Sequence, residues 1–311
     1  MTSKVKRYIN LSDSFNLDRP ILIIALGPTG SGKGSIPSKV LDTLKLPNNI
    51  VFEEILIDNL VENNLYYKNE IRGFIKRLRE KYQQEYPGLD QNDLIKIIVD
   101  NLITNQDTLT FFNNVYFHAR KKVPCLNPTF ETLKTCDEIN DERLDKAFKE
   151  GKNIVFETTG EYYPKWLFDL WKNEIKAYQY QIVLSYSVVE ICELIRRNYN
   201  RAKESMIEFI SNENVPAPRL PDIRLSIFKN KIRNIVDTFN KNVLTSTCNY
   251  IYDGCNIRIL VFDNNTRKRK IIYDSNSGNT HSEILSGFKY DVALCRSLTG
   301  GKKKSKRRSK K

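Results

Sequence analysis

An uninterrupted apolar run that ends in a glycine-rich loop constrains this chain more than any other feature. Residues 21–26 read ILIIAL, without the alternation of polar residues that marks a half-exposed strand. Such a run is typical of a strand buried on both faces of a parallel sheet. It leads directly into GPTGSGKGS, residues 27–35, and the segment 38–46 then has the pattern of a helix. Strand, loop and helix in this order predict an α/β domain with a phosphate-binding first turn.

The loop itself fits the pattern GxxxxGK and continues as Gly-Ser. Its glycines allow a tight turn in which backbone N–H groups point at phosphate oxygens, and Lys33 reaches the β- and γ-phosphates. Gly34 stands where many P-loop proteins place a hydroxyl that binds Mg²⁺. We therefore expect ATP to bind here and Mg²⁺ to be held mainly through water, and the predicted contacts are Gly27, Thr29, Gly30, Ser31, Gly32, Lys33, Gly34 and Ser35.

Strand and helix patterns then alternate along the chain. We expect strands at 54–57, 153–157, 180–186, 249–252, 256–262 and 270–273, and helices at 139–150, 164–175, 187–201 and 222–242. Residues 66–122 are mostly helical and too long for an ordinary connection, which indicates a helical insertion. The predicted fold class is therefore α/β: a doubly wound parallel sheet of P-loop kinase type, with this insertion and a C-terminal β-hairpin.

Two acidic residues stand where strands are expected to end. Asp58 follows the stretch 54–57, and Glu157 closes 153–157. Because the carboxyl ends of parallel strands meet at one edge of the sheet, both should lie near the phosphate loop. Asp58 is then a candidate to accept a proton from a substrate hydroxyl or to orient it, and Glu157 to hold Mg²⁺ through water. Roles as helix caps or turn residues stay open for both, and for Thr159, a candidate substrate or phosphate contact.

Arginines are the expected partners for the negative charge on a transferring phosphoryl group. Arg196, Arg197 and Arg201 follow the strand 180–186 on a predicted helix, and Arg219 lies in the proline-rich stretch VPAPRLP. Each also fits a solvated surface position.

Charge and cysteine content bear on the compartment and on partners. Eight of the last ten residues are Lys or Arg, and removing these eight charges from the net +13 leaves +5 for the rest. Such a block favours a disordered tail, and an import signal, a nucleic-acid or membrane-surface anchor and a solubilising end are all compatible with it. Six scattered cysteines without CxxC spacing predict free thiols in a reducing compartment. With no apolar run long enough to span a bilayer, we expect an intracellular protein, cytoplasmic or, through the tail, nuclear.

Taken together, these segments resemble the zeta-toxin group of P-loop kinases. The resemblance covers about residues 20–275 and is carried, in order, by ILIIALGPTGSGKGS, ILIDN, GKNIVFETTGE, YQIVLSYSVVEICELIRRN, PRLPDI and IRILVFDNN. It implies an ATP-dependent kinase domain over 20–298, preceded by a polar segment, 1–19, and followed by the basic tail, 299–311. It also implies transfer of the ATP γ-phosphate to a hydroxyl of a small molecule, such as a nucleotide sugar, and an antitoxin partner that this chain does not encode.

The resemblance also implies roles for individual residues. Lys33 and the loop would bind the ATP phosphates, and Glu157 and Thr159 match the E-x-T of the family. Arg219 matches an arginine that contacts phosphate, Arg201 or Arg197 a second one, and Asp141 a carboxylate that faces the substrate.

One departure from the family keeps alternatives open. The family has two aspartates one residue apart, with the second as base, whereas this chain reads Asp58-Asn59-Leu60. Asp58 or Glu62 is left to replace the missing base. The alternative functions are a nucleotide kinase or nucleic-acid-end kinase, and a nucleotide-binding protein without catalytic activity.

Overall fold

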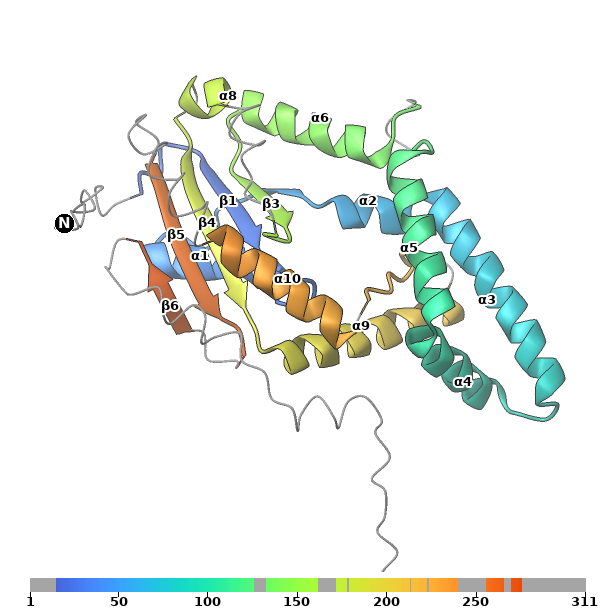
Figure 1. Ribbon diagram of the computed structural model, residues 1–311. Helices are drawn as coiled ribbons and strands as arrows, with labels where there is room; N and C mark the ends of the chain where they lie inside the picture. Colours follow the sequence, from blue (N-terminus) through green and yellow to red (C-terminus); the bar gives the residue numbers. More distant parts are fainter. Residues whose placement is uncertain are drawn as a thin grey trace, which may run out of the picture.

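A computed structural model describes residues 15–125, 133–161, 172–177, 179–212, 214–222, 224–239, 256–265 and 270–275. Its strands are β1 (Ile21–Leu26), β2 (Glu53–Ile55), β3 (Ile154–Thr158), β4 (Gln181–Val188), β5 (Asn256–Asp263) and β6 (Lys270–Asp274). They form one sheet in the order β2-β3-β1-β4-β5-β6 (Figure 1). Neighbouring strands from β2 to β5 are parallel, and β6 pairs antiparallel with β5.

The helices lie on both sides of this sheet and beside it. They are α1 (Ile36–Leu44), α2 (Ile57–Asn63), α3 (Leu65–Glu85), α4 (Gln91–Thr104), α5 (Gln106–Lys121), α6 (Cys136–Lys149), α8 (Lys172–Ala177), α9 (Ile191–Ser211) and α10 (Leu225–Thr238). A single 3₁₀ turn, Lys33–Ser35, joins the phosphate loop to α1. The predicted α/β class is confirmed, and so are the C-terminal strand pair and the helical insertion, which consists of α3, α4 and α5.

The two faces of β1 explain its unbroken apolar sequence. On one face, Ile21, Ile23 and Ala25 share a core with buried residues of α1 that include Val40. The alternate residues of the strand belong to a larger core on the other face, which includes buried residues of α6, α9 and α10. Successive side chains of a strand point to opposite faces, so a strand covered on both sides has no place for a polar residue.

The helical insertion has its own core beside the sheet. In Figure 1, α3, α4 and α5 stand away from the strands, next to α2 and the C-terminal end of α9. Tyr67, Ile98 and Phe112 are buried in this core, and Met206 and Phe209 of α9 join it. The insertion is thus packed as a unit of the domain, and α9 connects it to the sheet.

Some expectations from the sequence need correction. The second strand ends at Ile55, and Asp58 lies in the first turn of α2 rather than at a strand end. The helix after β4 continues to Ser211, ten residues beyond its expected end. Predictions for the first 14 residues, the basic tail, the strand at 249–252 and most of the helix at 164–175 lie outside the described residues. Within those residues, no helix combines the length and the apolar character needed to cross a bilayer.

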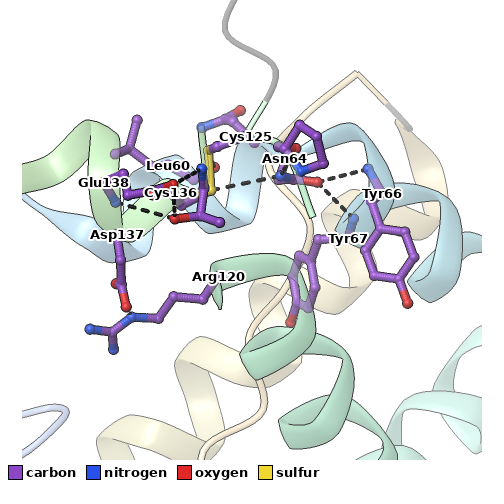
Figure 2. The surroundings of a disulfide bond; sticks show 12 residues. Leu60, Asn64, Tyr66, Tyr67, Arg120, Cys125, Cys136, Asp137 and Glu138 are labelled. Carbon is purple, nitrogen blue, oxygen red and sulfur yellow. Dashed lines mark hydrogen bonds and ion pairs between the residues drawn. A yellow bond between two sulfur atoms is a disulfide. The ribbon is translucent and has the colours of Figure 1, made fainter. Parts of the chain in front are cut away.

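The prediction of free thiols is wrong for three of the described cysteines. Cys125 and Cys136 form a disulfide, with 4.8 Å between their Cα atoms (Figure 2). Cys192 is disulfide-bonded as well. Packing of α5 against α6 brings the first two cysteines together, which their spacing in the sequence does not reveal. Since disulfides persist in oxidising surroundings, the cysteines no longer support a reducing compartment.

Candidate functional site

The phosphate loop follows β1 at the carboxyl edge of the sheet. Gly30 and Gly32 adopt left-handed backbone conformations, with φ of 82° and 83°. A Cβ atom on Gly30 would lie 2.4 Å from Nδ2 of Asn198, whereas a Cβ atom on Gly34 would meet nothing within 4 Å. The loop therefore requires glycine at position 30 for its shape, but not at position 34.

Three polar side chains outside the motif hold the loop from beneath. Asn198 of α9 donates to the carbonyl of Thr29 at 2.7 Å. Ser187 of β4 and Asn264, which follows β5, both donate to the carbonyl of Ser31, at 2.6 and 2.8 Å. These bonds fix the path of the loop without using a charge.

The residues predicted to contact phosphate differ in how far they are exposed. Ser31 is fully buried, and its backbone N–H donates to the carbonyl of Pro28 at 3.1 Å, so its side chain is not exposed to a ligand. The hydroxyl of Ser35 donates to the carbonyl of Gly32 at 2.8 Å. Thr29 is half-buried, and Gly32 and Gly34 are exposed.

Lys33 places a cation at the centre of the site. Its Nζ donates to the carbonyl of Gly27 at 3.0 Å and lies within 3.4 Å of the carbonyl of Pro28. Burial lowers the pKa of Lys33, and the carboxylate of Glu157 acts against that change. Among the described residues, the hydrogen-bond partners of the ammonium group are neutral carbonyls of the loop, an arrangement that favours an incoming phosphate anion.

Asp58 is engaged by two partners from distant parts of the chain. Arg219 forms an ion pair with Oδ2, and the hydroxyl of Tyr116 donates to Oδ1. The guanidinium of Arg219 also lies 5.7 Å from the ring centroid of Tyr116. Burial alone would raise the pKa of Asp58, but the charge of Arg219 and the two hydrogen bonds bring it below its usual range. Asp58 thus stays ionised and holds Arg219 in place.

Two further carboxylates lie within electrostatic range of the same cations. Burial raises the pKa of Glu157, an effect that Lys33 opposes and Asp58 strengthens. Burial likewise raises the pKa of Glu62, with Arg219 acting against it. Arg201 influences the charges of Glu62, Glu157 and Lys33, so it belongs to this group. Lys33, Asp58, Glu157, Arg201 and Arg219 therefore act on one another's charges, and the roles predicted for them in binding and catalysis stay predictions.

Arg196, Arg197 and Thr159 have partners other than the residues of this cluster. Arg196 and Arg197 both bind Glu193, and Arg197 also donates to the carbonyl of Asn264, which leaves Arg201 as the arginine of α9 that faces the site. The hydroxyl of Thr159 accepts from the N–H of Glu161 at 3.4 Å.

Asp141 belongs to a different group of charges, between α5 and α6. Asp141 is exposed over much of its surface. Partial burial of its carboxyl group and the charge of Asp137 raise its pKa, and the charge of Arg120 acts against this rise. Arg120 forms an ion pair with Asp137, and the charge of Asp58 also raises the pKa of Arg120. Asp141 is thus linked to the site only through Arg120, and its predicted role in binding substrate stays a prediction.

A metal would have few direct protein ligands in this site. Within the described ranges, no three His, Cys, Asp or Glu side chains converge as a metal centre. Gly34 has no hydroxyl to offer. These donors fit Mg²⁺ that is bound to phosphate oxygens and water, with Glu157 as the carboxylate whose charge acts most strongly on Lys33.

The sequence analysis missed Tyr116, Asn198, Ser187 and Asn264. Tyr116 is buried on α5 at a helical core spacing, so nothing in its context distinguishes it from a packing residue. Asn198 offers a weak signal, because an amide on the apolar face of an amphipathic helix needs a hydrogen-bond partner when buried.

Comparison of the sequence with protein-family models and with curated proteins finds no match. Among solved structures, one from the PezAT chromosomal toxin-antitoxin system of Streptococcus pneumoniae aligns with a TM-score of 0.47 and 16% identity, over 92% of this chain and 86% of that one. The crystal structure of AvrRxo1-ORF1:AvrRxo1-ORF2 with sulphate ions aligns with a TM-score of 0.35 and 10% identity, over 84% of this chain and 60% of that one. Both scores are too low to assign an activity; the P-loop fold of this chain is established by its own strand order and phosphate loop.

Proposed function

We propose that this protein is an ATP-dependent phosphotransferase that moves the γ-phosphate of ATP to a hydroxyl of a small molecule. The observation that carries the proposal is the convergence of three cations on one site from separate segments. Lys33 comes from the phosphate loop, Arg201 from α9, and Arg219 from the segment before α10. A site that only binds a nucleotide needs the loop, whereas a transferring phosphoryl group needs positive charge on several sides.

In this proposal, the loop amides and Lys33 bind the β- and γ-phosphates. Arg201 and Arg219 neutralise the charge that spreads over the oxygens of the transferring group. Asp58 keeps the guanidinium of Arg219 oriented before substrate arrives, so little reorganisation is needed during the reaction. When bound, Mg²⁺ would neutralise phosphate charge, and Glu157 would hold it through water.

The acceptor side of the site lies on α2 and the helical insertion. Asp58 and Glu62 come from α2, and Tyr116 comes from α5. We infer a polar acceptor with several hydroxyls, such as a nucleotide or a nucleotide sugar, because charged groups line this side. Asp141, with Arg120 and Asp137, is the next polar group outward and a candidate contact for the distal part of the acceptor.

The test is ATP turnover by the full chain with a mixture of nucleoside monophosphates and nucleotide sugars, followed as ADP release and as phosphorylated product by mass spectrometry. Lys33→Ala removes the central cation and is expected to lower turnover by about 10²–10³-fold. Lys96→Ala, at an exposed lysine of α4, is the matched control and should leave turnover unchanged.

Two results would contradict the proposal in different ways. Unchanged turnover in Lys33→Ala would show that the observed ATP consumption does not occur at this loop. Tight ATP binding by the wild-type chain without any transfer would favour the alternative of a nucleotide-binding protein without catalytic activity. Phosphorylation of a nucleic-acid end would instead identify the other alternative.

A further inference from the structure

The short helix α2 presents two different faces. Asp58 and Glu62 are four residues apart and therefore lie on one face, whereas Leu60 points to another. Leu60 packs with the core of the insertion, and its carbonyl oxygen lies 3.9 Å from Sγ of Cys125. Figure 2 shows Leu60 beside the Cys125–Cys136 disulfide. Position 60 is thus a packing position, and the face of α2 toward Arg219 carries Asp58 and Glu62.

Asp58 is poorly suited to accept a proton from substrate. Both of its oxygens are engaged, one by Arg219 and one by Tyr116. These partners favour the ionised form, and a carboxylate stabilised as an anion is a weaker base. Its geometry serves to orient Arg219.

Glu62 differs from Asp58 in its surroundings. Its side chain makes no hydrogen bond or ion pair with any residue that the structure describes. The charged and titratable groups around it are Arg219, Asp58, Arg201 of α9 and Tyr67 of α3. Its backbone is held, since its carbonyl accepts from the N–H of Ala217 at 2.8 Å. The backbone of Glu62 is therefore held in place, while its carboxylate makes no hydrogen bond or ion pair within the described part of the chain.

We propose that Glu62 is the residue that accepts the proton of the acceptor hydroxyl during phosphoryl transfer, and this rests on the proposed phosphotransferase function. The acceptor oxygen forms a bond to the γ-phosphorus, and the bond from that phosphorus to the β–γ bridging oxygen breaks. ADP leaves with the bond electrons, and the hydroxyl proton passes to the carboxylate of Glu62 and then to water.

The electrostatics of the site agree with this division of roles. Burial raises the pKa of Glu62 toward the range in which a general base works best, while the pKa of Asp58 is moved away from it. Arg219 interacts with both carboxylates: it forms an ion pair with Asp58, and its charge acts against the rise in the pKa of Glu62. A phosphoryl group bound by Arg219 would therefore have Glu62 close to its acceptor.

The test uses the full chain with ATP and the same acceptor mixture. Glu62→Gln keeps the size of the side chain and removes the base, so turnover should fall by about 10²–10⁴-fold. Affinity for a fluorescent ATP analogue should stay near that of the wild type. Glu62→Asp should recover part of the turnover. Glu80→Gln, at an exposed position on α3, is the matched control and should change neither quantity.

The pH profile separates a base from a structural carboxylate. The acid limb of the turnover profile should persist in Asp58→Asn, at a lower overall rate, and should disappear in Glu62→Gln. If Lys33→Ala abolishes turnover but Glu62→Gln retains both the rate and the acid limb, the role of Glu62 is refuted and the phosphotransferase stands. If the wild-type chain turns over no ATP, or Lys33→Ala turns it over normally, the proposed function fails and this inference falls with it.

Discussion

The two sides of the candidate site are built in different ways. The phosphate side is a run of nine residues, Gly27–Ser35, that sits between β1 and α1. The acceptor side takes Asp58 from α2, Tyr116 from α5 and Arg219 from the segment before α10. The phosphate side is therefore formed by one continuous stretch of sequence. The acceptor side is formed only when segments far apart in the chain, including the insertion, pack together.

The supports of the two sides differ in charge as well. Neutral amides and a hydroxyl hold the phosphate loop: Asn198, Asn264 and Ser187. On the acceptor side, Arg219 is held by the carboxylate of Asp58. Hydrogen bonds between neutral groups do not change with pH near neutrality, whereas an ion pair is lost when its acid is protonated. Loss of one charge should therefore weaken the support of Arg219 on the acceptor side and leave the neutral supports of the loop unchanged.

The largest effect of this kind is expected from Arg219→Ala. The change removes a cation for the transferring phosphoryl group, and loss of such an arginine lowers turnover by about 10³-fold or more. It also leaves Asp58 without its ion-pair partner, at an expected cost of about 1 kcal/mol or less in the free energy of unfolding, because solvent screens the partly exposed pair. ATP turnover and urea unfolding measure the two quantities.

Arg224→Ala is the control for that change. Arg224 lies five residues further on, with a side chain that is 53% exposed and paired only with Asp222 among the described residues. Loss of an exposed pair of this kind should change the stability little and leave turnover unchanged. Equal losses of turnover in the two variants would show that the segment before α10 acts through its fold, and not through the charge of Arg219.

The phosphate side can be tested with two of its own glycines. Gly30→Ala introduces a side chain at φ 82° and against Asn198, so we expect about a tenfold or greater loss of ATP affinity, equivalent to about 1–3 kcal/mol of backbone strain. Gly34→Ala enters open space and should leave affinity nearly unchanged. Titration with a fluorescent ATP analogue measures both. Equal effects of the two changes would mean that the glycines matter for another reason than loop shape.

The contrast between the sides also explains what the sequence predicted. The buried strand, the loop and the alternation of strands and helices are local patterns, and each is confirmed in the sheet. Arg201 and Arg219 were among several arginines that residue chemistry made candidates, and the family resemblance then gave Arg219, and Arg201 or Arg197, a role at the phosphate. Tyr116 was missed because a buried tyrosine on an amphipathic helix looks the same whether it packs or donates a hydrogen bond. The Cys125–Cys136 disulfide was missed because it depends on how α5 meets α6.

The position of Asp58 shows why boundaries matter. The sequence placed this residue after a strand, where carboxylates often face a ligand. In the structure, it lies inside the first turn of α2, and the helix then decides which later residue shares its face. Glu62 shares it and Leu60 does not, a distinction that a one- or two-residue error in the start of the helix would hide.

The smallest predicted effects concern stability, and they have opposite signs on the two carboxylates of α2. The lowered pKa of Asp58 means that its contribution to stability is present above the usual range of an aspartate and is lost as the pH falls through the lowered pKa. The raised pKa of Glu62 means that the folded state is favoured while Glu62 is protonated, and this advantage is lost as the pH rises through the raised pKa.

At neutral pH, Asp58→Asn should therefore lower the free energy of unfolding, by about 1 kcal/mol or less because the side chain is 41% exposed and solvent screens its pair with Arg219. Glu62→Gln should raise it slightly, by up to about 1 kcal/mol. Urea unfolding of both variants near about pH 5 and about pH 8 measures the difference, which should narrow at the lower pH. A residue that destabilises the fold but is needed for turnover is what a catalytic carboxylate is expected to be. If Glu62→Gln instead destabilises the protein as Asp58→Asn does, Glu62 belongs with the structural charges that hold Arg219, and the two carboxylates share one role.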